Sequence, residues 1–251
     1  MEKDRYAIAR WLFAGLIAIS MPGFLVGFAA QVISFVGFTG TGPIPDLSST
    51  INDLIAFSQQ AGFTLVVGAS LGVVLSLKGE EIPGLGTAAW YVRLVGHELV
   101  HAIFAKVCGY EIREFKLTRD GGYVAYYKRN ARGNFLIDLS PYLFPIIPII
   151  LLVAAYLVSG VARSIVILLL GISLGSHIAG TADEALEQYD VRQAGVFFSI
   201  TLIMACNIAL LMLVMIVVAP GRVSIADFLR TSVDFDIWYL SALARSIGEL
   251  I

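Results

Sequence analysis

The sequence predicts an all-α polytopic membrane protein of about six membrane segments, with a small β-hairpin between the third and the fourth. Hydrophobic residues make up 58% of the 251 residues and charged residues only 14%, whereas soluble domains carry about 25% charged residues. The apolar residues gather in runs that approach the roughly 20 residues a helix needs to cross a bilayer. We therefore expect an integral, multi-pass protein of the cell membrane, embedded in the lipid bilayer. The net charge of −2 gives no reason to expect a nucleic-acid partner.

The six apolar segments are expected at 11–36, 61–77, 87–108, 135–158, 161–179 and 195–219. Pro22-Gly23 predicts a kink in the first segment. Three prolines disfavour a regular helix in the fourth segment: Pro141, Pro145 and Pro148. Irregular backbone at membrane depth must be surrounded by protein or a water-filled cavity. The second segment is short, so it is the one we expect not to cross fully.

The segments divide the chain into three parts. Residues 1–86 hold the N-terminal membrane segments and their connectors. Residues 87–194 hold the core, with the helix that carries HELVH, the hairpin and the segment that carries the first-choice third ligand. Residues 195–251 hold the last membrane helix and a tail whose apolar residues recur at helical spacing. The tail is expected either to lie in the membrane interface or to pack against the bundle.

Residues 112–128 are expected to form a hairpin. EFKLT and YVAYY are rich in residues that favour strands, and RDGG between them supplies a tight turn. Positive charge concentrates in and after this hairpin, at Arg113, Lys116, Arg119, Lys128, Arg129 and Arg132. The positive-inside rule places it in the cytoplasm. Six simple crossings would then place the N-terminus outside, whereas Lys3, Arg5 and Arg10 favour the inside, so the topology of the N-terminus stays open.

The stretch RLVGHELVHAIFAK, residues 93–106, places ionisable groups inside an apolar run. His97 and His101 are four residues apart, so a helix puts both on one face, as two imidazoles that chelate one ion require. Glu98 is set off around the helix, where a general base for a metal-activated water is expected. Ionisable groups within a membrane segment cost several kcal/mol and usually mark function. The alternative is a helix end in solvent with two chance histidines.

A zinc site of this kind takes three protein ligands and leaves one position for water. His177, the only other histidine, stands among glycines at the end of the fifth segment and is the first choice for the third ligand. Asp183 is the second choice. Thr181 and Glu184 could form a capping box there that leaves Asp183 available. Asp138, in the proline-broken segment, is the third choice, and it could instead orient a histidine ligand.

On these residues the chain resembles the site-2 protease family of intramembrane zinc metalloproteases. The resemblance rests on an HExxH pattern, HELVH at 97–101, followed by a hairpin with a GG turn, a proline-broken segment and a segment whose end carries a candidate ligand. It covers roughly residues 87–190. The family's third ligand is an aspartate in a motif like Leu-Asp-Gly, which does not occur here. Asp183 is its nearest positional counterpart, so the chain would be a divergent member.

The resemblance implies an enzyme that hydrolyses peptide bonds of membrane-embedded or membrane-attached protein substrates near the cytoplasmic face. His97 and His101 would bind Zn²⁺ and Glu98 would activate water. The hairpin would offer an edge strand that holds the substrate extended. The alternative is a metal-binding membrane protein without hydrolysis, either a zinc transporter or a pseudoprotease. A transporter would space its ligands along a route across the bilayer, whereas these candidates cluster.

Overall fold

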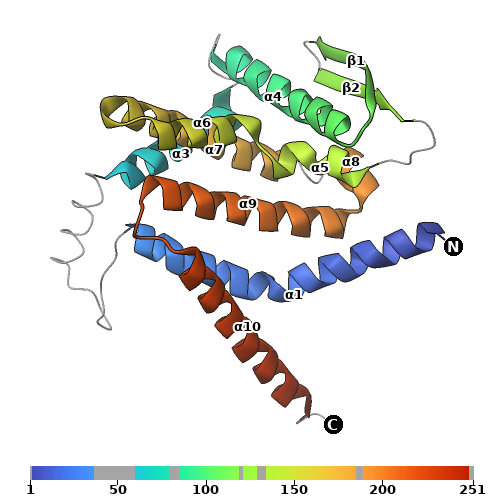
Figure 1. Cartoon of the computed structure of the whole chain (residues 1–251), viewed down its shortest axis with the longest axis vertical. Helices are drawn as coiled ribbons and strands as arrows, with labels where there is room; N and C mark the ends of the chain where they lie inside the picture. The colour runs from blue at the N-terminus through green and yellow to red at the C-terminus, as the bar shows by residue number, and fades with distance from the viewer. Residues whose placement is uncertain are drawn as a thin grey trace. The chain divides into compact units, whose positions relative to one another are not determined.

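The structure is a computed structural model of the whole chain, and it describes residues 2–36, 60–79, 85–118, 121–128, 134–184 and 189–248. The helices and strands follow in the order α1 (Glu2–Val36), α3 (Ala61–Lys78), α4 (Leu85–Val107), β1 (Glu111–Thr118), β2 (Gly121–Tyr127), α5 (Phe135–Leu143), α6 (Ile146–Leu157), α7 (Gly160–Glu184), α8 (Tyr189–Ala194), α9 (Val196–Val218) and α10 (Ile225–Gly248) (Figure 1). They form two compact units, Met1–Phe63 with Ile208–Ile251, and Thr64–Asn207. The predicted core at 87–194 lies within the second unit.

Four helices of the described part are long and apolar enough to cross a membrane, namely α1, α3, α7 and α9. The bent pair α5 and α6 makes a fifth span if it is counted as one. The predicted mostly helical membrane protein is therefore confirmed, but the count of six is not. The third predicted segment forms α4 but is not among these candidate spans. Its histidines, Arg93, Glu98 and Lys106 make α4 more polar than the other predicted segments. The short second segment, which we expected not to cross fully, forms α3 and is long and apolar enough to cross a membrane.

The proline-rich fourth segment is broken, as the sequence predicts. Helices α5 and α6 meet at an angle of 51°. The break falls at Phe144 and Pro145, where Pro145 takes an extended conformation before the first turn of α6. Proline has no backbone N–H to continue the ladder of hydrogen bonds, so the chain starts a new helix here. This break turns the first half of the segment toward α4, on which α5 packs.

Helices α3 and α7 approach closely because both present glycines at the contact. A Cβ atom on Gly72 would lie only 2.0 Å from the Ile172 carbonyl oxygen, and one on Gly175 equally close to the Ala69 carbonyl oxygen. The Ser176 hydroxyl donates a 2.9 Å hydrogen bond to the carbonyl of Gly72. Small residues four apart are typical of close helix contacts in membranes. The contact therefore holds in place the turn of α7 that directly precedes His177.

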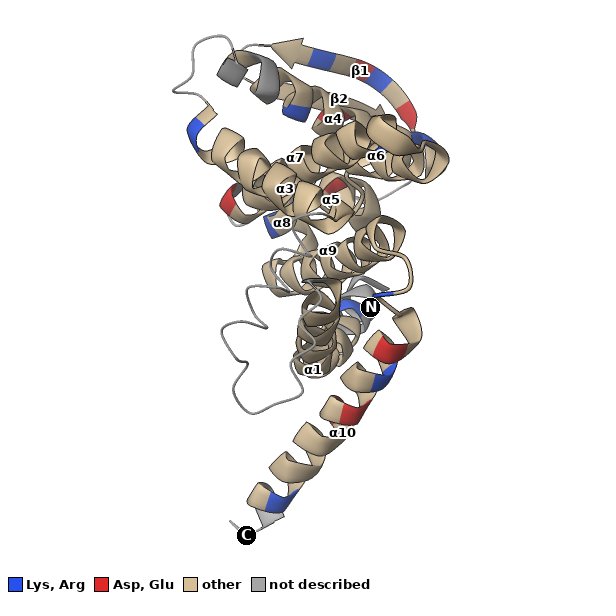
Figure 2. Ribbon diagram, turned by 90° about the vertical axis from the view of Figure 1, so that its left-hand side faces the viewer, with Lys and Arg blue, Asp and Glu red and all other residues tan. Residues whose placement is uncertain are grey.

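The tail forms α10, which packs against α1 within the first unit. The N–H of Gly23, next to Pro22, donates a 2.9 Å hydrogen bond to Oδ1 of Asp236. The N–H of Ser224 donates to the Gln31 side chain at 3.0 Å. Helix α1 runs through Pro22 and bends along its length (Figure 1). The remaining surface of α10 carries exposed apolar residues between acidic and basic ones (Figure 2).

The predicted hairpin is confirmed. Strands β1 and β2 pair antiparallel, with Phe115 opposite Val124, and an irregularity in register falls between Ile112 and Glu114. The two glycines of the expected turn open β2, while Arg119 and Asp120 lie outside the described residues. The Thr118 hydroxyl donates a 2.8 Å hydrogen bond to the Gly121 carbonyl and ties the two strand ends together. Both strands contact α4, so the hairpin is seated on the helix that carries the histidine pair.

Candidate metal centre

His97 and His101 face each other on one side of α4. The Nε2 atoms of the two rings lie 3.2 Å apart. Two nitrogens bound to one tetrahedral zinc ion at about 2.0–2.1 Å would be separated by about 3.3–3.4 Å. The observed spacing is close to that of two ligands of a single ion. The helical periodicity that suggested the pair from the sequence thus brings their ring nitrogens together.

The orientation of His101 is fixed by the backbone of α5. Its Nδ1 lies 2.8 Å from the carbonyl oxygen of Ile137. A carbonyl can only accept, so Nδ1 carries the hydrogen and the lone pair is on Nε2, which faces His97. Histidine ligands of metals are typically held in this way by a hydrogen bond on the other ring nitrogen. The Ile137 carbonyl also accepts from the Ser140 hydroxyl at 2.7 Å.

Glu98 is buried between α4 and the hairpin, with 6% of its surface exposed. A Cβ atom on Gly122 would lie 2.8 Å from Cγ of Glu98. Only a glycine at this point of β2 lets the glutamate side chain occupy its present position. Glu98 therefore lies beside the histidine pair in the sequence, but packs against a different element. Its role in the site stays a prediction.

His177 lies on α7 and is held by a residue that the sequence analysis missed. Its Nε2 lies 3.1 Å from Oδ1 of Asn207, on α9. The Asn207 amide nitrogen donates to the carbonyls of Tyr142 at 3.0 Å and Ile203 at 2.9 Å. The sequence did contain a signal for this residue. Asn207 is the one amide side chain of α9, and an amide without a partner in apolar surroundings is costly, so a nearby partner is expected.

The two acidic candidates lie in different surroundings. Asp138 is 5% exposed, and its Oδ1 accepts a 2.8 Å hydrogen bond from the hydroxyl of Tyr126 on β2. Asp138 follows Ile137, the residue whose carbonyl orients His101. Asp183 is exposed in the last turn of α7. Helix α7 runs through Thr181, so that residue does not cap a helix start.

Of the candidate ligands, the structure brings His97 and His101 together. In the described part of the chain, no three His, Cys, Asp or Glu side chains are grouped closely enough to hold an ion. The pair itself fits zinc by its nitrogen spacing and by the tautomer of His101. The identity of the third ligand stays a prediction.

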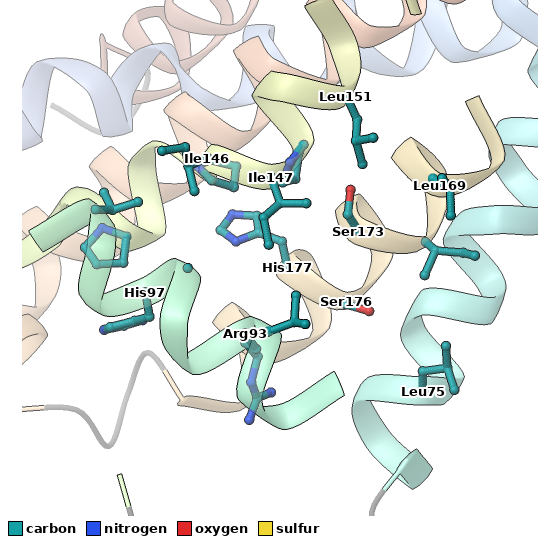
Figure 3. Close-up of a pocket in the computed structure, with 17 residues that line it drawn as sticks. Leu75, Arg93, His97, Ile146, Ile147, Leu151, Leu169, Ser173, Ser176 and His177 are labelled. Carbon is teal, nitrogen blue, oxygen red and sulfur yellow. The ribbon is translucent and has the colours of Figure 1, made fainter. Parts of the chain in front are cut away.

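A cavity of about 430 Å³ lies beside His97 (Figure 3). His97 and His177 both line it, although they come from different helices. Arg93, one turn before His97, lies at its edge and donates a 3.4 Å hydrogen bond to the Ser76 hydroxyl. The cavity thus brings the first-choice third ligand to the same space as one member of the pair.

Comparisons of the chain with models of protein families, with curated proteins and with solved structures found no match. The resemblance to the site-2 protease family therefore rests on the residues of the motif and the order of the elements. Any function drawn from it is a proposal.

Proposed function

We propose that the chain is an intramembrane zinc metalloprotease that hydrolyses peptide bonds of membrane-embedded or membrane-attached proteins. The observation that carries the proposal is the pair of opposed Nε2 atoms of His97 and His101, 3.2 Å apart. The Nδ1 hydrogen bond of His101 to Ile137 supports it, because the lone pair of Nε2 then faces the ion position.

His97 and His101 would hold the ion, and His177 is the first choice for the third ligand because it lines the cavity that His97 also lines. Asp138 already accepts from Tyr126, and Asp183 is exposed at a helix end. Bound zinc would supply Lewis-acid chemistry that polarises a peptide carbonyl and makes water a better nucleophile near neutral pH.

Glu98 would act as the general base and then as the general acid. Its carboxylate takes a proton from the attacking water and later gives it to the nitrogen of the departing amine. Burial against Gly122 holds its side chain in a narrow range of positions, which is what a proton-transfer group needs.

The hairpin would hold the substrate. A peptide bond in a helix is shielded by its own hydrogen bonds, so the substrate must unwind before it is cut. In the sheet that the structure describes, β1 and β2 pair only with each other. Each strand therefore presents an edge that can pair with an extended peptide.

Metal binding without hydrolysis is the alternative, and it differs from the proposal in the role of one residue. A binding site or a transporter needs His97 and His101 but has no use for Glu98. The deciding comparison is therefore a substitution that leaves the ligands in place.

The experiment measures cleavage of single-span transmembrane peptides by the purified, zinc-loaded protein. Glu98→Gln is expected to keep zinc and to abolish cleavage. Asp227→Asn, the equivalent loss of a carboxylate at an exposed position of α10, is the control and should cleave as the wild type does. Equal turnover by Glu98→Gln and the wild type would remove Glu98 from the mechanism, and cleavage by neither would favour the non-hydrolytic alternative.

A further inference from the structure

The cavity beside His97 has apolar walls contributed by four stretches of the second unit. Helix α3 supplies Leu75, α4 supplies Val92 and Val100, and α7 supplies Leu169 and Ile172. Helix α5, the proline break and α6 supply the remaining wall: Pro141, Pro145, Ile146, Ile147, Pro148 and Leu151. Its volume of about 430 Å³ lies within the range of roughly 300–1,000 Å³ that is typical of ligand sites.

The serine and arginine side chains at this cavity have partners within the protein. The hydroxyl of Ser173 donates to the Leu170 carbonyl at 3.0 Å, and that of Ser176 to Gly72 at 2.9 Å. Arg93 donates to Ser76, and its guanidinium points away from the centre of the cavity (Figure 3). A polar ligand would gain little here and would lose its own hydration. The cavity is therefore suited to an apolar group.

The position of the cavity relative to His97 limits what can reach it. Gly96 lines the cavity and precedes His97 directly, and a Cβ atom there would lie 3.5 Å from Cδ1 of Ile147 on α6. That distance is an ordinary van der Waals contact, so α4 and α6 lie close together at this point. A peptide whose carbonyl lies at the histidine pair has neighbouring residues about 3.3 Å further along the chain. A side chain next to the cut bond can thus lie within reach of the cavity that His97 lines.

We propose that the cavity is the subsite for a bulky aliphatic side chain of the substrate, carried by a residue next to the bond that is cut. This proposal rests on the proposed protease function, which it makes specific. The proposed occupant is a substrate side chain, because His97, one of the proposed metal ligands, is among the residues that line the cavity. The subsite selects by apolar bulk, since its walls are mostly apolar side chains.

The test fills the cavity by one substitution. Ser173→Phe places a ring in the cavity, and Ser164→Phe makes the same change at an exposed position of α7, which serves as the control. Transmembrane peptides that carry Leu or Ala at successive positions are cleaved, and the products are identified by mass spectrometry. The wild type and Ser164→Phe should prefer Leu over Ala next to the cut bond by about tenfold or more in kcat/KM. Ser173→Phe should lose this preference and bind as much zinc as the wild type.

A second measurement needs no turnover. Glu98→Gln protein is irradiated with a peptide that carries a photoreactive leucine, and the crosslinked residues are mapped. The proposal expects crosslinks to Leu151, Leu169 or Ile172, and their loss in the protein that also carries Ser173→Phe.

The outcomes separate the two proposals. If the wild type and Glu98→Gln both leave every peptide intact, the protease function fails, and crosslinking still decides whether the cavity binds a peptide side chain. If the wild type cleaves but Ser173→Phe keeps the preference for Leu, the subsite proposal is overturned. A phospholipid that co-purifies in the cavity and blocks the peptide crosslink would overturn it as well.

Discussion

The hydroxyl of Tyr126 donates a 2.8 Å hydrogen bond to Oδ1 of Asp138 and so joins strand β2 to helix α5. The residue before Asp138 is Ile137, whose carbonyl orients His101. The strand that would hold the substrate and the histidine that would hold the metal are therefore connected through two consecutive residues of α5.

Tyr126→Phe should destabilise the protein, because a buried carboxylate loses one of its donors. The expected loss is about 1–3 kcal/mol, measured as a shift in the unfolding transition in detergent. Tyr127→Phe is the control, since Tyr127 is 44% exposed and a phenylalanine keeps the ring that Arg113 covers. Equal stability of the two variants would show that the hydrogen bond to Asp138 contributes nothing.

Gly122→Ala should impair the reaction without removing the metal. The new Cβ would lie 2.8 Å from Cγ of Glu98, so the glutamate must move, and a misplacement of about 1 Å can cost on the order of 100-fold in rate. We expect kcat to fall by about 10- to 100-fold while zinc content is unchanged. Gly15→Ala on α1, where a Cβ meets no atom within 4 Å, is the control. Wild-type kcat in Gly122→Ala would mean that the present position of Glu98 is not needed.

Gly72→Ala should weaken the contact between α3 and α7. A Cβ atom there would lie 2.0 Å from a backbone oxygen, that of Ile172, and backbone cannot turn aside as a side chain can. Overpacking of this kind costs about 1–3 kcal/mol, which denaturant unfolding would measure against Gly15→Ala. Because α7 carries His177, zinc affinity should fall together with stability. An unfolding midpoint equal to that of Gly15→Ala would contradict this packing.

Asn207→Leu should lower zinc affinity if His177 is the third ligand. The change removes the acceptor at His177 Nε2 and the donor to the Tyr142 carbonyl, and loss of a group that orients a ligand typically costs about 10- to 100-fold in metal affinity. Thr201→Val is the control on the same helix, because it loses only a hydrogen bond to Phe197 in its own helix. Titration with a competing chelator measures both. The same zinc Kd in the two variants would exclude this role of Asn207.

Periodicity and composition predict the local features of the fold. A 3.6-residue period brings His97 over His101, the β-rich runs around two glycines form the hairpin, and the prolines break the fourth segment. Each of these features depends on residues close together in the sequence. The number of membrane segments was less predictable, because Glu98 and its neighbours lower the hydropathy of α4 while they create its chemistry.

The partners that lie far away in the sequence were not predictable. Nothing near His101 indicates that the Ile137 carbonyl will orient it, since any backbone carbonyl could do so. Asn207 is 30 residues from His177, and only its isolation among apolar residues could have drawn attention to it. The close fit of Glu98 against Gly122 depends on how the hairpin is seated on α4, which a single sequence does not specify.

The measurement that tests the central claim most directly is the zinc content of the purified chain, wild type beside single alanine variants of the candidate ligands. We predict about one zinc ion per wild-type chain and its loss in His97→Ala and in His101→Ala. His177→Ala should bind less zinc, whereas Asp183→Ala, at an exposed position, should bind as much as the wild type. Zinc content in His101→Ala equal to that of the wild type would contradict the claim that this histidine pair holds a metal ion.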